Sequence, residues 1–344
     1  MRTALITGAR GLVGGAVMRR FTRDGYDVTG LDCEARRAFL GETASRSRSA
    51  SIDILNIDLR NEGAVQRLLA TRPAFDVVVH AAAQPSHPLS VSFPRQDFDS
   101  NALATSILLD AVRTRCVDTT FLYCSSNKVY GDWVNRLPLE VRGNRLELAD
   151  DHPSWAGITE TAPVDKSIHT PFGVSKLAAD MLVQEYGHTY EMPTASVRFG
   201  CITGAGHGGV PFHGFLSYLA RCYVEEETYS IIGFHGYQVR DIIHASDVAH
   251  AFSLMAHSPR VAAVYNLGGG RGRECSVLEA IAAFERLGGT EMKVALSKEE
   301  PRIGDHRWWV TDVAGFRTDY PCWQPTVTLD EVFHELYVDA KGMT

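Results

Sequence analysis

Short apolar segments alternate with amphipathic ones through the first two hundred residues of the chain. Short apolar segments rich in β-branched residues lie at 4–7, 27–32, 53–58, 75–82, 119–126 and 194–200. Such segments are typical of parallel strands that are buried on both faces. The stretches between them, for instance 14–24, 62–72 and 101–115, repeat their apolar residues at helical spacing. This alternation predicts an α/β fold with a doubly wound parallel sheet.

The pattern changes near residue 200, where glycine-rich turns and short strands begin. Two further helical stretches follow at 277–288 and 329–339. We predict a first domain at 1–200, with a return segment near 237–267, and a second, smaller lobe that is mainly 201–344. Two sections are polar and irregular: 36–51 is expected to be an exposed loop, and 131–170 is expected to form a wall of the ligand site.

Composition and charge exclude several classes of function. The 344 residues are 45% apolar and 22% charged, as in ordinary globular proteins, and the formal net charge is −7. This charge gives no electrostatic reason to expect nucleic acid or an anionic membrane as a partner. The seven cysteines form no CxxC pair, so we predict neither a metal site nor a disulfide framework. No leader peptide or membrane span is visible, and we expect a cytoplasmic protein.

The sequence TGARGLVG at 7–14 follows the first strand directly and precedes a helix. In this context Gly8 permits a tight turn, Gly11 lets the backbone approach a pyrophosphate, and Gly14 allows close helix packing. The first helical N–H groups, from Leu12 and Val13, suit phosphate oxygens. An ordinary β-turn is the alternative. The motif predicts a Rossmann dinucleotide-binding domain.

Acidic residues end the second and third strands. Asp32 is placed to accept a ribose 2′-hydroxyl, which favours NAD over NADP. Arg36 and Arg37 follow it and could instead hold a 2′-phosphate. Asp58 and Leu59 close the third strand, where adenine could be contacted. As an alternative, Asp58 caps the next helix.

The fourth strand is followed by three small residues and two polar ones. The small side chains of Ala81, Ala82 and Ala83 would let a cofactor lie against the backbone. Gln84 and His87 are candidate substrate contacts. For His87, a solvated loop position is an equal alternative.

Two further candidate groups follow the fifth strand and open a later helix. Ser126 and Asn127 come just past the fifth strand, where a hydroxyl could bond to a substrate hydroxyl or ketone. Phe172 and Lys176 stand four residues apart and therefore share one face of a helix. Lys176 could bond to a nicotinamide ribose and lend positive charge to the pocket.

Together these motifs resemble the extended short-chain dehydrogenase/reductase family, and the resemblance spans nearly the whole chain. A closer similarity is to nucleotide-sugar epimerases of the CDP-paratose (CDP-tyvelose) 2-epimerase type. It is carried by NKVYGD (127–132), HTPFGVSKLAAD (169–180), GYQVRDIIH (236–244), YNLGGG (265–270) and PRIGDHRWWVTD (301–312). The resemblance implies that NAD is held by the first domain, with Phe199 at the end of the sixth strand among its contacts.

The resemblance also implies that a nucleotide-diphosphate sugar binds to the second lobe. Arg240 would contact the diphosphate, and Arg302 and Asp305 would clamp phosphate and ribose, because guanidinium groups suit phosphate oxygens. The base would lie against the strand that begins at Tyr229. Surface ion pairs are the alternative for these residues. Family analogy further implies a homodimer, formed through helices near 96–115 and 172–190.

The chain departs from the family pattern at position 172, where the family has a tyrosine whose phenol removes the hydroxyl proton. A first explanation is another base, with Cys201 ranked before Lys176, and Lys128 or Tyr130 after both. A thiol beside positive charge has a lowered pKa, although Cys201 could equally be a small buried hydrophobe. The second explanation is that the tyrosine was removed by design to trap a complex, which would weaken the enzyme. The third is a protein that binds NAD and sugar nucleotide without turnover.

The reaction implied by the family is redox-neutral. A hydride leaves a sugar carbon for NAD, the keto-sugar turns over, and the hydride returns to the opposite face. We predict an NAD-dependent epimerase of a nucleotide-diphosphate sugar, and the resemblance points to inversion at C2. Alternatives are inversion at another carbon, dehydration, decarboxylation, or binding without catalysis. A dehydratase commonly has an acidic pair beside the helix that carries the lysine, and Ser126, Asn127 and Lys128 offer none.

Overall fold

The computed structural model describes residues 1–33, 54–211 and 213–342. The chain divides into two compact units. Unit 1 comprises Met1–Val129, Pro171–Phe199 and Ala245–Tyr265, and unit 2 comprises Tyr130–Thr170, Gly200–His244 and Asn266–Thr344. Each unit is therefore assembled from three separate stretches of sequence. The irregular section 131–170 belongs to unit 2.

Unit 1 is built on a seven-stranded sheet with the order β12-β8-β5-β4-β1-β2-β3. Its strands are β1 (Thr3–Thr7), β2 (Asp27–Asp32), β3 (Ile54–Asn56), β4 (Val77–His80), β5 (Thr120–Ser126), β8 (Thr194–Phe199) and β12 (Ala263–Leu267). From β3 to β8, every neighbouring pair is parallel. The chain order reverses between β1 and β4, at the kind of switch point where such sheets bind ligands. The predicted doubly wound parallel sheet is confirmed.

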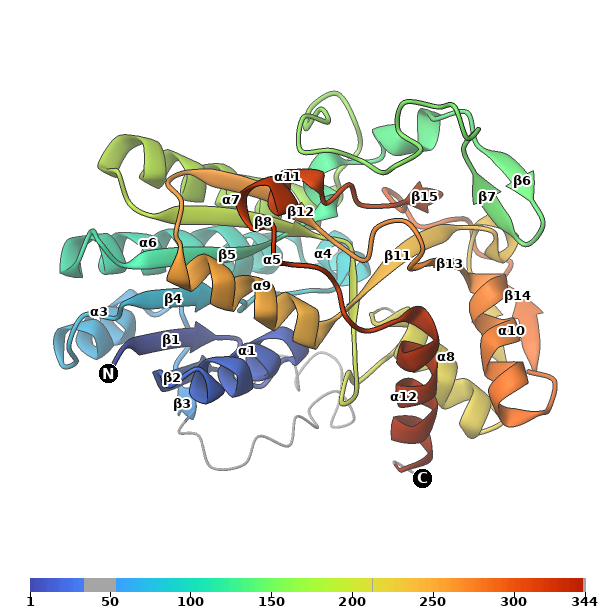
Figure 1. The fold of residues 1–344 in the computed structure, drawn as a ribbon, viewed down its shortest axis with the longest axis horizontal. Helices are drawn as coiled ribbons and strands as arrows, with labels where there is room; N and C mark the ends of the chain where they lie inside the picture. Colours follow the sequence, from blue (N-terminus) through green and yellow to red (C-terminus); the bar gives the residue numbers. More distant parts are fainter. Residues whose placement is uncertain (34–53, 212, 343–344) are drawn as a thin grey trace. The chain divides into compact units, whose positions relative to one another are not determined.

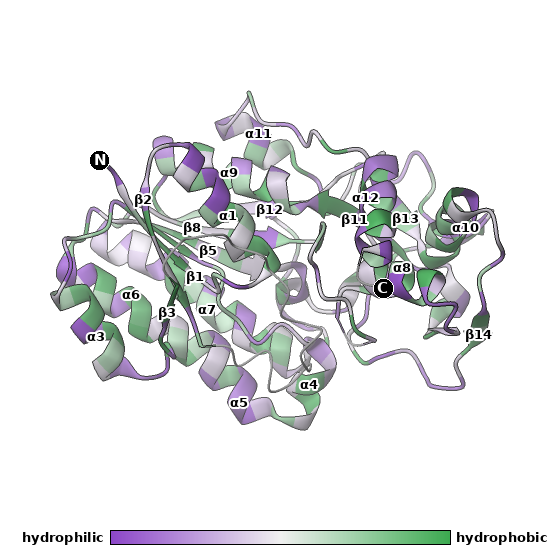
Figure 2. Cartoon of the chain, turned by 90° about the horizontal axis from the view of Figure 1, so that it is seen from below, coloured by the Kyte–Doolittle hydropathy of each residue, from purple (hydrophilic) through white to green (hydrophobic). Residues whose placement is uncertain are grey.

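Helices cover both faces of this sheet (Figures 1 and 2). One face carries α1 (Leu12–Arg23) and α9 (Ala245–His257), and the other carries α3 (Glu62–Ala70), α6 (Ala104–Arg115) and α7 (Thr170–Tyr190). The segment before α6 consists of α4 (His87–Ser92), α5 (Pro94–Phe98) and the π-helical turn η2 (Asp99–Leu103). Leu108, Phe121 and Val183 are buried between the sheet and the second group of helices. Burial of each such side chain stabilises the fold by about 1.5–3 kcal/mol.

Unit 2 contains smaller sheets. In one, β11 (Val239–His244) pairs with β9 (Cys201–Thr203), β13 (Glu274–Ser276) and β15 (Trp308–Trp309). The hairpin β6 (Glu140–Arg142) and β7 (Arg145–Glu147) is antiparallel, whereas β10 (Tyr229–Ile231) pairs in parallel with β14 (Val294–Leu296). The helices are α8 (Phe215–Val224), α10 (Val277–Gly288), α11 (Ala314–Asp319) and α12 (Leu329–Lys341). Short helical turns are η3 (Asn127–Tyr130), η4 (Trp133–Arg136) and η5 (Phe234–Gly236).

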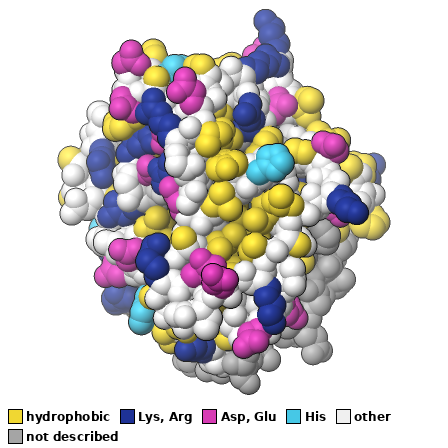
Figure 3. Space-filling model, turned by 90° about the vertical axis from the view of Figure 1, so that its right-hand side faces the viewer, with side chains coloured by type: hydrophobic (Ala, Val, Ile, Leu, Met, Phe, Trp, Pro, Cys, Tyr) yellow, Lys and Arg dark blue, Asp and Glu magenta, His cyan; other side chains and the backbone are white. Residues whose placement is uncertain are grey.

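A second hydrophobic core holds α8, α10 and α12 together, with Phe284 and Phe333 in edge-to-face contact at its centre. The N-terminus of α10 is fixed by a capping box in which Ser276 and Glu279 each accept from the other's backbone N–H. Hydrophobic side chains also gather on the surface of the molecule in the view of Figure 3. The three residues of β14 are all exposed. An exposed apolar surface is typical of a contact region.

Candidate active site

The glycine-rich turn after β1 has the tight geometry that a dinucleotide site needs. Gly8 has φ +66°, and a Cβ there would lie 2.8 Å from backbone atoms of Ala81 and Ala82. A Cβ on Gly14 would lie 2.1 Å from the carbonyl oxygen of Gly8. Around Gly11 a Cβ would meet only that same carbonyl oxygen, at 3.1 Å, so this side of the turn is open. The turn therefore fits a pyrophosphate that approaches the backbone.

The start of α1 suits phosphate oxygens, and β2 ends on a carboxylate. Gly11 is the N-cap of α1 and gives no side-chain cap, so the first N–H groups, including those of Leu12 and Val13, face outward from the helix end. Asp32 Oδ2 accepts from the backbone N–H of Arg10 at 3.0 Å, which fixes the carboxylate beside the turn. These residues fit NAD. The predicted alternatives Arg36 and Arg37 lie outside the described residues.

Asp58 and Leu59 occupy different surroundings at the end of β3. The Asp58 carboxylate is bound by the guanidinium of Arg60 at 2.6–3.1 Å, and these hydrogen bonds hold the pKa of Asp58 below its ordinary value. Asn61, not Asp58, caps α3, so the alternative of Asp58 as a helix cap is wrong. Leu59 is buried in the core of unit 1.

A buried chain of hydrogen bonds ties β1 to β4. Thr7 Oγ1 lies 2.7 Å from His80 Nδ1 and accepts from the backbone N–H of Ala82 at 3.1 Å. His80 Nε2 lies 2.9 Å from Thr105 Oγ1. Burial lowers the pKa of His80 from 6.5 to about 3, so the ring is neutral. These bonds fix the backbone at 81–83, where the small side chains Ala81 and Ala82 are half-buried and Ala83 is exposed.

Lys176 is enclosed by the sheet of unit 1. Its Nζ donates to the carbonyl oxygen of Cys124 at 2.6 Å and lies 4.4 Å from the centre of the Tyr123 ring. The residue is 4% exposed. Burial lowers the pKa of Lys176 from 10.5 to about 8, against the opposing charges of nearby groups. A buried ammonium, with a pKa below its ordinary value but still above 7, therefore lies under the end of β5.

One turn further along α7, a buried ion pair was not predicted from the sequence. Arg198 donates to both carboxylate oxygens of Asp180, at 2.8 and 3.0 Å, and Ser125 donates to the same carboxylate. Both charged residues are almost fully buried. The pair joins α7 to β8 and β5, and so fixes the helix that carries Lys176.

Phe172 and Lys176 lie on α7 as predicted, and Phe172 meets His87 from the segment after β4. The two ring centroids are 6.3 Å apart, with an interplanar angle of 88°. Phe172 is 7% exposed and His87 is half-buried. His87 is therefore a packed residue, and the alternative of a solvated loop position is wrong.

The residues after β5 divide between the two units. Ser126 is half-buried and accepts from the N–H of Lys128 at 3.2 Å, and Asn127 is almost fully buried. Tyr130 belongs to unit 2, where its hydroxyl donates to the side chain of Asn266 at 2.8 Å. A phenol that is buried and hydrogen-bonded in this way has a packing role, which argues against Tyr130 as the catalytic base.

In unit 2, three of the predicted substrate residues are already engaged in hydrogen bonds. Arg240 donates to Asp305 Oδ1 at 2.8 Å, and Arg302 donates to the carbonyl oxygen of Pro211 at 2.8 Å. Tyr229 is buried beside α8, and burial raises the pKa of its phenol although Arg302 acts in the opposite direction. The ion-pair alternative and a phosphate-binding role are compatible, because a paired guanidinium keeps further N–H groups.

Cys201 and Phe199 flank the boundary between the units. Cys201 lies on β9 and packs against the hydrophobic core of unit 2. Phe199 ends β8 in unit 1, where its ring stands edge-on to Phe252. A thiol packed among apolar side chains suits a structural role, and the role of Cys201 as a base stays a prediction.

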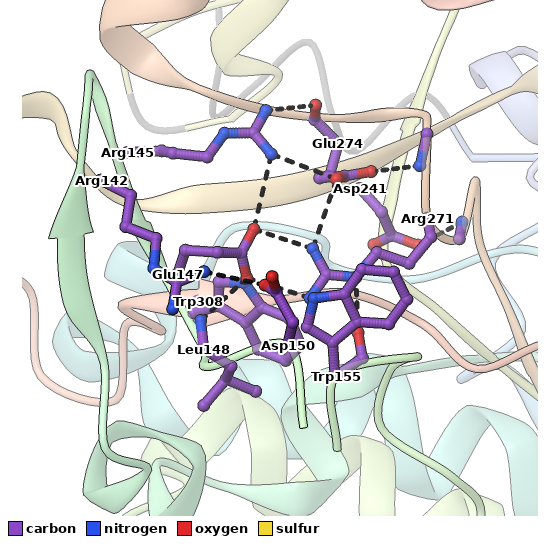
Figure 4. Close-up of polar contacts among 12 residues, drawn as sticks. Arg142, Arg145, Glu147, Leu148, Asp150, Trp155, Asp241, Arg271, Glu274 and Trp308 are labelled. Atoms are coloured by element: carbon purple, nitrogen blue, oxygen red, sulfur yellow. Dashed lines mark hydrogen bonds and ion pairs between the residues drawn. The ribbon is translucent and has the colours of Figure 1, made fainter. Parts of the chain in front are cut away.

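A cluster of arginine and glutamate side chains in unit 2 was also not predicted (Figure 4). The arginine–glutamate cluster consists of Arg145, Glu147, Arg271, Glu274 and Glu279. Arg145 binds both oxygens of Glu279 at 2.8 Å, and Arg271 binds both oxygens of Glu147 at 2.8 and 3.0 Å. Burial would raise the pKa of Glu147, but the hydrogen bonds from Arg271 bring it below its ordinary value. The cluster joins β7, β13 and α10.

A cavity of about 490 Å³ lies next to this cluster in unit 2. Its lining includes Trp155, Gly270, Arg271, Arg273 and Arg317. The predicted substrate residues of unit 2 are not part of this lining. Within the ranges that the structure describes, no group of side chains could hold a metal ion, and no helix is long and apolar enough to span a membrane.

Comparison with known families identifies the class of protein. Residues 4–268 match the model of the NAD dependent epimerase/dehydratase family, which is most of the chain. The chain belongs to this family. The family is NAD-dependent, which confirms the predicted cofactor, and the turn after β1 has the geometry to hold it. The resemblance to extended short-chain dehydrogenases/reductases is likewise confirmed.

Two curated relatives cover almost the full length of the chain. A CDP-paratose 2-epimerase from Salmonella typhi is 27% identical, over 97% of this chain and 97% of the relative. A dTDP-glucose 4,6-dehydratase from Xanthomonas campestris pv. campestris is also 27% identical, over 96% of this chain and 91% of the relative. Identity at this level supports an enzyme of the epimerase/dehydratase class without separating the two activities.

Solved structures agree with the fold. A UDP-glucose 4-epimerase from Thermotoga maritima, solved with UDP-glucose, superposes with a TM-score of 0.80 at 22% identity, and 99% of this chain and 98% of that chain are covered. MoeE5, solved with UDP-glucose and NAD, has a TM-score of 0.78 at 26% identity and covers 100% of this chain and 99% of its own. The Rossmann sheet with its second unit is therefore shared with nucleotide-sugar enzymes.

Proposed function

We propose that the protein is an NAD-dependent epimerase of a nucleotide-diphosphate sugar. The sugar is oxidised transiently to a ketone, and the hydride returns to the opposite face of the same carbon. The observation that carries the proposal is the buried Lys176, whose charge lies under the end of β5 on the helix that follows the family pattern. NAD supplies the hydride acceptor. C2 is the proposed carbon, because the chain is similar to a CDP-paratose 2-epimerase.

In this proposal unit 1 holds the cofactor and unit 2 holds the nucleotide. The turn around Gly8 binds the pyrophosphate, Asp32 the adenosine ribose and Lys176 the nicotinamide ribose. Ser126 and Asn127 contact the reacting sugar. In unit 2, Arg240 and Arg302 bind the diphosphate, Asp305 the ribose, and Tyr229 lines the base. His87 contacts the sugar, whereas the side chain of Gln84 binds Ser86 and Asp97 and holds the segment that carries His87.

The segment after β5 favours epimerisation over dehydration. Elimination of water needs a general acid and a general base in addition to the hydride step. Residues 126–128 read Ser-Asn-Lys, which supplies no carboxylate. A second candidate function is binding without turnover, and the missing hydroxyl at Phe172 is the observation that favours it.

The decisive experiment incubates the NAD-loaded protein with CDP-, UDP-, GDP- and dTDP-sugars in deuterated water and follows the products by NMR. Inversion at one carbon without incorporated deuterium supports the hydride route. Deuterium at a carbon next to a ketone would replace the proposal by enolisation, and loss of a hydroxyl would replace it by dehydration. Retention of NAD with no conversion of any sugar would favour the second candidate function, which is binding without turnover.

We also propose that the protein is a homodimer formed through α6 and α7. Phe98 and Leu103 before α6, and Val174 and Met181 on α7, are exposed apolar side chains of unit 1. Such residues are typical of a contact surface. Light scattering coupled to gel filtration tests this: Val174→Asp with Met181→Glu should give a monomer, whereas Val338→Glu on α12 should not. A natural chain that elutes as a monomer would overturn the proposal. The cytoplasmic location stays a prediction.

A further inference from the structure

His87 brings a titratable ring into contact with Phe172, the residue at which the family has a tyrosine. It is the first residue of α4, and its ring stands edge-on to Phe172 with centroids 6.3 Å apart. Aromatic rings at this separation are in direct contact. This contact places an imidazole next to the side chain of residue 172.

A buried polar network holds this pair of rings in a fixed geometry. Ser175, in the first turns of α7, donates to Asp97 and accepts from Asn101 at 3.0 Å. Asn101 accepts from the backbone N–H of Gln84 at 2.8 Å, and the side chain of Gln84 donates to Asp97 at 2.8 Å. The segment that carries His87 is thus bound to the helix that carries Phe172 through side chains that are themselves buried. Such networks are rigid when every member is paired.

The backbone at His87 is also fixed from its own side. Ser86 caps α4 by accepting from the N–H of Leu89, and the carbonyl oxygen of His87 accepts from Ser90 Oγ at 2.7 Å. Pro88 follows at the start of the helix and restricts the main chain further. A base that acts in catalysis needs this kind of preorganised position.

We propose that His87 takes the proton from the substrate hydroxyl, in place of a phenol at residue 172. This inference rests on the proposed epimerase function. In the oxidation step an imidazole nitrogen accepts the hydroxyl proton, the C–O bond becomes C=O, and the carbon loses its hydrogen with both electrons. NAD, when bound, accepts that hydride and returns it. On the return His87 gives its proton back to the oxygen, so proton and electrons balance over the cycle.

The recorded contacts of three other candidate bases in the described chain do not include the ring of Phe172. An imidazole ordinarily titrates near neutral pH, which suits a general base. The ammonium of Lys176 is bound to the carbonyl oxygen of Cys124 at 2.6 Å. The hydroxyl of Tyr130 is bound inside unit 2, and Cys201 packs against the hydrophobic core of that unit. His87 is the candidate that contacts Phe172 directly.

The test compares four variants of the NAD-loaded full-length protein on the sugar nucleotide that the substrate panel identifies. They are His87→Ala, Phe172→Tyr, the double variant, and His188→Ala, an exposed histidine on α7 that serves as the matched control. Turnover is measured together with the Kd of the sugar nucleotide by calorimetry. Turnover of His87→Ala is measured again with added free imidazole.

His87→Ala should lower turnover by about 10²–10⁴-fold, the usual contribution of a general base, while the Kd changes by less than about threefold. Free imidazole should restore part of the loss, and His188→Ala should match the natural chain. The phenol in the double variant should make His87 dispensable, so that its turnover approaches that of Phe172→Tyr alone. His87→Ala with at least half of the natural turnover, or a double variant as slow as His87→Ala, overturns the inference. If neither the natural chain nor Phe172→Tyr converts any sugar, the proposed function itself fails.

Discussion

Lys176 is a buried cation. Burial of this charge should destabilise the fold, and replacement by methionine should remove that destabilisation. The side chain is 4% exposed, and burial lowers its pKa from 10.5 to about 8. The residue binds one carbonyl oxygen and the face of one ring, and has no carboxylate within ion-pair distance among the recorded contacts of the described chain. We expect Lys176→Met to be more stable than the natural chain at pH 7.

The sign and size follow from the two pKa values. The folded state binds fewer protons than the unfolded state between pH 8 and 10.5, so stability rises with pH in that interval and the full cost is present below about pH 8. The lowering of the pKa of Lys176 from 10.5 to about 8 corresponds to a loss of about 3 kcal/mol in the free energy of unfolding. Loss of the hydrogen bond to Cys124 destabilises the variant by about 1 kcal/mol and so reduces this gain. The expected net gain for Lys176→Met is therefore about 2 kcal/mol at pH 7, and it should vanish by about pH 10.

Urea unfolding of the cofactor-free protein, followed by circular dichroism at pH 7 and at pH 10, measures this difference. Lys293→Met is the control, because Lys293 is a largely exposed lysine and its replacement should change the free energy of unfolding by less than about 0.5 kcal/mol. A Lys176→Met variant that is less stable than the natural chain at pH 7, with no pH dependence in the difference, would refute the reasoning. The same variant should bind NAD more weakly in calorimetry.

Three further changes test other parts of the structure. Arg198→Met should lose about 3–5 kcal/mol of unfolding free energy in urea, because Asp180 is left as a buried unpaired charge; adding Asp180→Leu should recover most of the loss, and a double variant no better than the single one would contradict this. Gly8→Ala forces a Cβ to 2.8 Å from the backbone of Ala81 at a positive φ; a strain of about 1–3 kcal/mol should weaken NAD binding about tenfold or more by calorimetry, and unchanged affinity would count against the turn as the pyrophosphate site. Arg271→Ala removes both hydrogen bonds from Arg271 to Glu147, which keeps an ion pair with Arg145 at 3.6 Å. The free energy of unfolding should fall by about 1–3 kcal/mol, the usual cost of losing hydrogen bonds to a buried charged group, and an unchanged Tm would show the cluster to be neutral.

The sheet and the glycine turn were predictable because both depend on residues close together in the sequence. A strand such as β4 can be recognised as a short β-branched run, Val77 to Val79. The turn at Gly8 needs only the strand before it and the helix after it. The family pattern then extends this local information to Asp32 and Lys176. The family pattern gives the position of each residue in the fold, but it does not give the partners of its side chain.

The contacts that were missed join residues far apart in the sequence. Arg145 and Glu279 are 134 residues apart, and they meet only because β7 and α10 are brought together in unit 2. Asp180 and Arg198 are 18 residues apart on adjoining elements, and nothing in the local pattern marks them as a pair. The contact of His87 with Phe172 is of the same kind, so the sequence left open whether His87 was solvated.

Because residue 172 is a phenylalanine, the charge on Lys176 has a different role from the one it has beside a tyrosine. Beside a phenol, a lysine ammonium stabilises the phenolate; beside Phe172 there is no phenolate to stabilise, yet the lysine remains buried at a cost of about 3 kcal/mol. A cost of that size to the fold is typical of a functional group. In the proposed mechanism the charge of Lys176 holds the cofactor, which separates two tasks that one Tyr-Lys pair performs together. Proton transfer is then assigned to a different side chain, and we propose His87 because its ring contacts that of Phe172.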